Sequence, residues 1–210
     1  SRKEMLERAN TPEARAMAEA LKGFLELCDT QEIAPSDGLE TSTLEFRSEP
    51  DGNKILIQFI RPQSAESLPC VYYIHGGGMQ AMSCFDGNYR AWGRIIAARG
   101  VAVAMVDFRN ALTPSSAPEV APYPAGLNDC VAGLKWLVGQ ATSLGIDASR
   151  IIVAGESGGG NLTLATGMGL RREGALHLIK GLYSGCPYLT RILPLPQNPP
   201  SIDNNPLLMD

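Results

Sequence analysis

Residues 155–161 read Gly155-Glu156-Ser157-Gly158-Gly159-Gly160-Asn161. An apolar run typical of a strand, 150–154, precedes them, and a run typical of a helix, 162–172, follows them. A serine inside G-x-S-x-G between a strand and a helix is the pattern of a nucleophile elbow. Gly155 and Gly159 carry no side chain, so neighbouring backbone can pass close to this sharp turn. We expect Ser157 to project above the sheet edge at a helix N-terminus, where a developing negative charge is stabilised.

A second glycine-rich segment, His75-Gly76-Gly77-Gly78, follows the apolar run 70–74. An HGGG loop after the third strand supplies backbone N–H donors to the oxyanion hole of lipases and esterases. The intermediate of acyl transfer carries a negative charge on the former carbonyl oxygen, and side chains would obstruct the approach of the N–H groups to it. We therefore expect an oxyanion hole formed by the N–H groups of Gly76, Gly77 and Gly158.

Together with Val106-Asp107-Phe108-Arg109, these two segments resemble the hormone-sensitive-lipase-like family of α/β-hydrolases. The resemblance extends over about residues 44–189 and is greatest to bacterial esterases of the brefeldin A esterase type. It implies hydrolysis of a small carboxylic ester through an acyl-enzyme on Ser157. It also implies an α/β-hydrolase fold with a helical cap, and neither a metal nor an organic cofactor.

The chain departs from that family in its histidines. After the elbow, the family continues through further strands that deliver the catalytic acid and then the histidine. This chain has only two histidines. His75 belongs to the oxyanion loop, and we interpret His177 as a solvated loop residue at the opposite edge of the sheet from Ser157. Asp203 and Asp210 come too early in the fold order to be the catalytic acid. We therefore expect a C-terminally incomplete chain that lacks the triad acid and histidine and is inactive in isolation.

Three alternatives remain open at this point. A second polypeptide could supply the missing strands of an esterase. A non-catalytic, receptor-like protein on the same scaffold would bind a small carboxylic acid, because such receptors keep the loop and the elbow but lack the histidine. A degenerate remnant without function at the site is the third alternative.

Composition restricts the other classes of function. Hydrophobic residues make up 44% of the chain and charged residues 19%, with a net charge of −4, as in ordinary globular proteins. No Lys/Arg-rich run is present, which argues against nucleic acid and anionic membranes as partners. No apolar stretch reaches the roughly 18 residues of a membrane span. The five cysteines are scattered without zinc spacing, which favours reduced thiols in the cytoplasm. The first residue is not Met, which suggests a trimmed start.

The pattern along the chain predicts an α/β fold with a mostly parallel, doubly wound sheet. We expect an N-terminal helical cap segment at 1–40, the hydrolase core with its first six strands at 41–190, and the Pro-rich start of a second cap segment at 191–210. The expected helices are 3–30 (with a new start at Thr11-Pro12), 89–99, 127–144 and 161–172. The expected strands are 44–47, 54–61, 70–74, 101–106, 151–154 and 180–185. Both motifs then lie at the carboxyl ends of strands, where ligands bind in such sheets.

Several other side chains have expected roles. Met79, Phe85, Tyr89 and Trp92 are candidates for a substrate pocket beside the oxyanion loop, although aromatic residues at a loop-to-helix junction are also typical core residues. Glu156 leaves the elbow in a different direction from Ser157, so we expect it to anchor the loop. Asp107 and Arg109 are expected to form a structural pair after the fourth strand.

Overall fold

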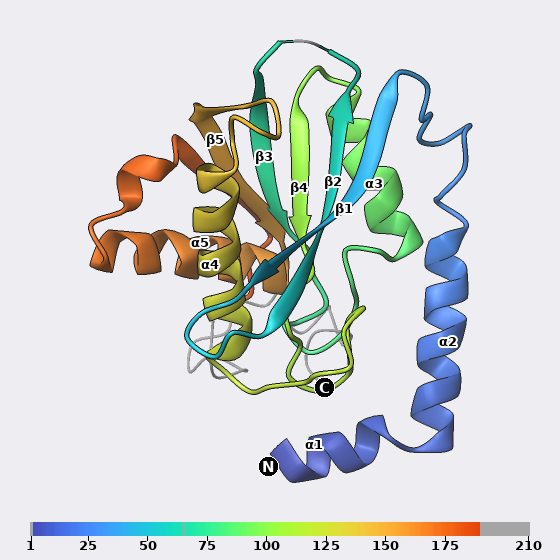
Figure 1. Cartoon of the computed structure of the whole chain (residues 1–210). Helices are drawn as coiled ribbons and strands as arrows, with labels where there is room; N and C mark the ends of the chain where they lie inside the picture. Colours follow the sequence, from blue (N-terminus) through green and yellow to red (C-terminus); the bar gives the residue numbers. More distant parts are fainter. Residues whose placement is uncertain (1, 65, 190–210) are drawn as a thin grey trace, which may run out of the picture.

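The computed structural model describes residues 2–64 and 66–189 (Figure 1). In this part of the chain, six strands form one mixed sheet in the order β1-β2-β4-β3-β5-β6. The strands are β1 (Leu39–Arg47), β2 (Lys54–Pro62), β3 (Leu68–Ile74), β4 (Ala102–Val106), β5 (Ile146–Glu156) and β6 (Gly181–Gly185). β2 pairs antiparallel with both β1 and β4, and the remaining neighbours are parallel. The predicted α/β class with a mostly parallel sheet is confirmed.

Helices cover both faces of this sheet (Figure 1). The helices are α1 (Arg2–Ala9), α2 (Pro12–Glu26), α3 (Gly87–Ala97), α4 (Ala125–Gly139) and α5 (Gly158–Arg172), with a 3₁₀ turn, η1 (Leu176–Leu178). α3 packs on one face against β2 and β4, while α4 and α5 lie on the other face. None of the described helices is long and apolar enough to cross a membrane.

Two apolar cores follow from this layering, because successive residues of a strand point to opposite faces. Tyr72 belongs to the larger core under α4 and α5, whereas its neighbour Tyr73 belongs to the smaller core under α3. All five residues of β4 are buried, since both faces of this central strand are covered. This is why the strand reads as a continuous apolar run in the sequence.

The N-terminal segment contains two helices separated at Thr11. The Thr11 side chain accepts a hydrogen bond from the Ala14 N–H (3.2 Å), and Pro12 occupies the first helical turn. Both are preferred features of a helix start, so the predicted new start is confirmed. No residue of α2 is buried, and Met17, Leu21 and Phe24 are exposed.

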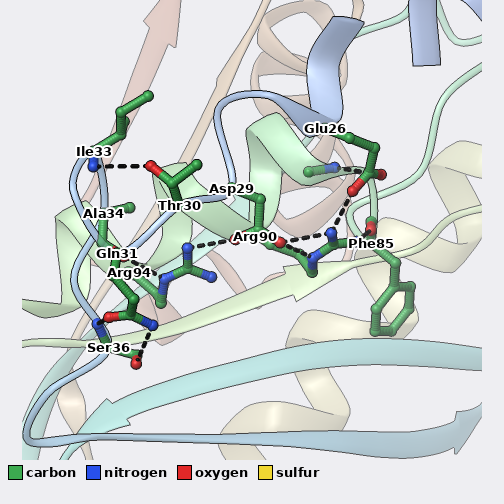
Figure 2. A network of polar contacts seen from close by, with 11 residues as sticks. Glu26, Asp29, Thr30, Gln31, Ile33, Ala34, Ser36, Phe85, Arg90 and Arg94 are labelled. Carbon is green, nitrogen blue, oxygen red and sulfur yellow. Dashed lines mark hydrogen bonds and ion pairs between the residues drawn. The ribbon is translucent and has the colours of Figure 1, made fainter. Parts of the chain in front are cut away.

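The C-terminal end of α2 is attached to α3 by ion pairs (Figure 2). Arg90 contacts Glu26 (2.5 Å) and Asp29 (2.6 Å), and Arg94 also pairs with Asp29. Glu26 Oε1 accepts a hydrogen bond from the Gly87 N–H (3.2 Å). Asp86, the N-cap residue of α3, makes no side-chain capping bond, so a carboxylate from α2 helps to cap α3.

Some predicted boundaries were wrong. β5 begins at Ile146, well before the predicted 151, and its first half is polar and mostly exposed. α4 ends at Gly139 and does not continue to 144, since residues 140–145 form turns and Gly145 (φ 64°) leads into β5. The predicted division at residues 40 and 190 stays a prediction, and the Pro-rich segment 191–210 lies outside the described residues.

Candidate active site

Ser157 lies between the end of β5 and the start of α5. Its backbone has φ 54° and ψ −119°, a combination that residues with a side chain rarely adopt. The Ser157 N–H donates to the Gly185 carbonyl (2.9 Å), and the Ser157 carbonyl accepts from the Asn161 N–H (3.0 Å). These bonds hold the strained conformation that is expected of a nucleophile elbow, and Ser157 is exposed.

The glycines flanking the serine are required by close backbone contacts. A Cβ atom on Gly155 would lie 2.6 Å from the carbonyl oxygens of Ile74 and Gly159. A Cβ atom on Gly159 would lie 2.7 Å from the His75 carbonyl carbon and closer still to the Ile74 oxygen. The prediction that Gly155 and Gly159 allow backbone to pass is therefore confirmed.

The HGGG loop lies against this elbow. β3 and β5 are parallel neighbours with Ile74 opposite Gly155, so the segments that follow them meet at one sheet edge. Gly77 and Gly78 have φ values of 93° and 63°, which favour glycine. A Cβ atom on Gly158 would lie 2.8 Å from the Gly78 nitrogen, so the two loops are in direct contact.

The hydrogen bonds of Gly76 contradict its expected role as an oxyanion donor. Its N–H points to two acceptors, Glu156 Oε1 (2.9 Å) and the Tyr89 hydroxyl oxygen (2.8 Å). That N–H is consequently not free for a substrate oxygen. The N–H groups of Gly77 and Gly78, in contrast, have no acceptor among the described residues. The motif alone could not predict this, because Glu156 reaches Gly76 from a different strand.

The Glu156 carboxylate accepts hydrogen bonds at both oxygens. The Tyr89 hydroxyl donates to Oε1 (2.6 Å) and the Tyr73 hydroxyl to Oε2 (2.5 Å). Burial, followed by the nearby Glu156 charge, raises the pKa of both tyrosines, so both remain protonated donors. The prediction that Glu156 anchors a loop is confirmed, and the loop that it holds is the HGGG loop.

Neither histidine of the described structure contacts the serine hydroxyl. His75 is wholly buried, stacks on Phe108 (ring centroids 4.3 Å apart), and has Nδ1 2.9 Å from the Gly76 carbonyl oxygen. Burial lowers the pKa of His75, which favours the neutral ring with its proton on Nδ1. His177 is exposed in η1, as predicted for a solvated loop residue, and its Nδ1 lies 3.2 Å from the Gly174 carbonyl oxygen.

A family model described as an alpha/beta hydrolase fold matches residues 71–207. The chain belongs to the α/β-hydrolase family.

Known relatives of this α/β-hydrolase include several esterases. The structure of esterase Est22 is 63% identical with a TM-score of 0.97, and the match covers 100% of this chain and 62% of Est22. Est22 with p-nitrophenol matches with a TM-score of 0.96, 63% identity and the same coverage. Brefeldin A esterase, described as a bacterial homologue of human hormone-sensitive lipase, is 39% identical with a TM-score of 0.70, over 83% of this chain and 48% of that one. The predicted resemblance is confirmed.

The curated relatives are considerably longer than the matched region. The carboxylesterase NlhH of Mycobacterium tuberculosis is 40% identical over 102 residues, which cover 49% of this chain and 30% of NlhH. The chain therefore spans about a third of the length of this relative and less than two thirds of Est22.

Three of the candidates for a substrate pocket in this α/β-hydrolase, Met79, Phe85 and Tyr89, differ in their surroundings. Tyr89 is 5% exposed and its hydroxyl is used by Gly76 and Glu156, so its main contacts are with the loop, and its role in a pocket stays a prediction. Met79 and Phe85 are partly buried against the two cores, and their pocket roles stay predictions. A groove of about 710 Å³ lies elsewhere, along α4, the β1–β2 turn and the end of α5.

Asp107 and Arg109 brace the site separately, so the expected pair between them was wrong. Asp107 Oδ1 accepts from the Ser83 hydroxyl (2.6 Å) and the Cys84 N–H (3.2 Å), which fixes the segment after the HGGG loop. Arg109 instead pairs with Asp129 of α4 (2.7 Å) and with Asp51 (2.6 Å). Asp129 is wholly buried, and an acid within the apolar stretch of a helix was the signal that sequence reasoning missed.

The described residues contain no group of three or more His, Cys, Asp or Glu side chains arranged to hold a metal ion. The chemistry that the site offers comes from a strained serine, a helix N-terminus and glycine N–H groups.

Proposed function

We propose that the protein is a carboxylesterase that uses Ser157 as its nucleophile. The observation that carries this proposal is the strained Ser157 at the end of β5, in contact with a glycine loop whose Gly77 and Gly78 N–H groups have no acceptor among the described residues. Esterase relatives such as Est22 and NlhH support the same activity. Because the chain spans only part of their length, the activity of the whole protein is itself a proposal.

The proposed reaction has two steps. Ser157 Oγ loses its proton to a histidine base and bonds to the ester carbonyl carbon. The resulting oxyanion is stabilised by the N–H groups of Gly77, Gly78 and Gly158, the last at the N-terminus of α5. Collapse breaks the bond to the alcohol, which receives the proton from the histidine. Water then releases the acid from the acyl-enzyme by the same route, with no metal or organic cofactor.

The histidine base and its partner acid are expected outside the described residues, since His75 is buried and His177 is in η1. A native mass clearly above that of the 210-residue chain would support further polypeptide in the working enzyme. We also propose a cytoplasmic location, because Cys70, Cys84 and Cys130 are buried without disulfide partners.

The substrate class is proposed to be a small carboxylic ester. Est22 has been observed with p-nitrophenol, the alcohol product of the common p-nitrophenyl esters. Hydrolysis of a short-chain p-nitrophenyl ester by the full-length native protein is the direct test. Ser157→Ala should reduce kcat on the order of a million-fold, as loss of the nucleophile does in a serine protease.

The exposed Ser143, in the turn before β5, provides a matched control. Ser143→Ala should leave kcat unchanged. Equal turnover by wild type and Ser157→Ala would show that the hydrolysis does not depend on this serine and would refute the proposal.

A non-catalytic binding protein is the second candidate. The observation in its favour is that Ser157 Oγ has no hydrogen bond to a histidine in the described part of the chain. Saturable binding of a small carboxylic acid by a full-length protein that has no ester turnover would favour this function.

A further inference from the structure

The Glu156 carboxylate connects the two loops of the site. It directly precedes Ser157 at the end of β5, whereas Gly76 follows β3. Oε1 accepts the Gly76 N–H (2.9 Å) and the Tyr89 hydroxyl (2.6 Å), and Oε2 accepts the Tyr73 hydroxyl (2.5 Å). The side chain is therefore fixed by three donors that come from β3, the HGGG loop and α3.

The Glu156 carboxylate and the Tyr89 hydroxyl approach Gly76 closely. A Cβ atom on Gly76 would lie 2.5 Å from Glu156 Oε1 and 3.0 Å from the Tyr89 hydroxyl oxygen. Hydrogen bonds to an ionised carboxylate are short and about twice as strong as those between neutral groups. The Gly76 peptide unit is thus fixed in position and orientation.

This fixed unit sets the direction of the N–H groups that follow. With the Gly76 N–H bound to Glu156, the chain turns at Gly77 (φ 93°) and Gly78 (φ 63°), whose N–H groups keep no protein acceptor among the described residues. The Gly78 nitrogen lies against Gly158, directly after the nucleophile. An oxyanion hole requires this kind of accuracy, because a misplacement of about 1 Å can cost roughly a hundred-fold in rate.

We propose that Glu156 is a positioning residue for ester hydrolysis, holding the HGGG loop in register with Ser157 through the Gly76 N–H. This inference rests on the proposed esterase function. In the described part of the chain, both Glu156 oxygens are engaged by two tyrosine hydroxyls and the Gly76 amide, and these contacts suit an anchor of the HGGG loop better than a triad acid.

The kinetic test uses the full-length protein with Glu156→Ala and Glu156→Gln. Glu156→Ala removes the acceptor, so kcat should fall about a hundred-fold, the lower end for loss of an oxyanion donor. KM should stay within about two-fold, because the contact orients the oxyanion hole and does not bind the ground-state ester. Glu156→Gln keeps an oxygen for Gly76, so its kcat should be within about ten-fold of wild type.

Two tyrosine variants make a matched pair. Tyr73→Phe removes one donor to Glu156 and should reduce kcat by a few-fold. Tyr183→Phe changes a tyrosine on β6 whose hydroxyl does not contact Glu156, and it should have no effect. A stability role alone would lower the unfolding temperature of Glu156→Ala while kcat per folded molecule stayed at the wild-type value, and that result would overturn the proposal.

Amide hydrogen exchange at Gly76 gives a readout that needs no turnover. The Gly76 N–H should exchange slowly in wild type and faster in Glu156→Ala, where only the Tyr89 hydroxyl remains as acceptor. It should exchange fastest in Glu156→Ala/Tyr89→Phe, which removes both. Unchanged exchange in these variants would overturn the proposal whether or not the protein is an esterase. An inactive wild type with the predicted exchange would refute the esterase function alone.

Discussion

Ser157 is held in a backbone conformation that costs on the order of 1–3 kcal/mol. Its φ of 54° persists because the Ser157 N–H and carbonyl are bonded to Gly185 and Asn161. The same geometry turns the serine away from the strand and exposes it at the N-terminus of α5. Backbone strain that the surrounding structure holds in place is typical of a functional residue.

The close contact of Gly159 leads to a stability prediction. In Gly159→Ala the new methyl group meets the carbonyls of Ile74 and His75, so we expect a loss of about 1–3 kcal/mol in unfolding free energy. Gly139→Ala is the matched control, since a Cβ atom there has nothing within 4 Å and alanine favours the helix by up to about 1 kcal/mol. Urea unfolding of both variants measures the difference. Equal stabilities would contradict the close packing of the elbow.

Buried His75 makes stability depend on pH. Because burial lowers its pKa in the folded state, the unfolded chain binds a proton more readily, and stability must fall as the pH drops below about 6.5. The fall continues until the pH reaches the folded-state pKa, with a slope of at most about 1.4 kcal/mol per pH unit for one proton.

Measuring the free energy of unfolding at several pH values between about 5 and 8 tests the contribution of His75. His75→Gln should remove this part of the pH dependence, while His177→Gln at an exposed site should retain it. An identical pH profile for His75→Gln and wild type would show that the buried imidazole does not contribute.

Among single residues, the nucleophile motif and the glycines of the elbow could be predicted from the sequence. The roles of Gly76 and Tyr89 could not be predicted in this way, because they depend on the position of the Glu156 carboxylate. That position follows from the pairing of β3 with β5 and from the docking of α3, which are tertiary contacts. Asp107 and Arg109 illustrate the same limit, since neighbours in sequence have different partners in the structure.

Among the elements, the strands of the core were predictable from their apolar runs. β4 is buried on both faces and β3 is nearly so, and therefore each reads as apolar throughout. The first half of β5 was missed because residues 147–150 are mostly polar and mostly exposed. Its start is specified by pairing of Ile146 with Leu68 and not by hydrophobicity.

The attachment of α2 to α3 depends on the Asp29 carboxylate. Although burial opposes its ionisation, hydrogen bonds from Arg94 and Arg90 lower the pKa of Asp29 below 3.8. The contact is therefore complete above about pH 4 and is lost as the pH falls through the folded-state pKa. Asp29→Asn should weaken the same ion pairs at neutral pH. The amide hydrogens of α2 should then exchange faster, while those of β4 should exchange at the wild-type rate.

Glu7→Gln is the control for this experiment. Glu7 lies 4.0 Å from Lys3 in an exposed pair of the kind that contributes little to stability. If Asp29→Asn exchanged in α2 no faster than Glu7→Gln, the ion pairs with Arg90 and Arg94 would not be what holds the helix.

For the molecule as a whole, the parallel order of β4, β3 and β5 brings three loops to one edge of the sheet. The HGGG loop, the segment after β4 and the elbow meet there, although they are far apart in the sequence (Figure 1). The helices on both faces then fix these loops from the sides, through Tyr89 of α3 and Asp129 of α4. The proposed chemistry follows from this convergence.

Covalent labelling of the full-length protein with a small p-nitrophenyl phosphonate, followed by mass spectrometry of its peptides, tests most directly whether Ser157 is the nucleophile. We expect one phosphonyl group per chain, attached to Ser157 and absent from Ser157→Ala. Labelling at another residue, or ester hydrolysis that continues with Ser157 unmodified, would contradict it.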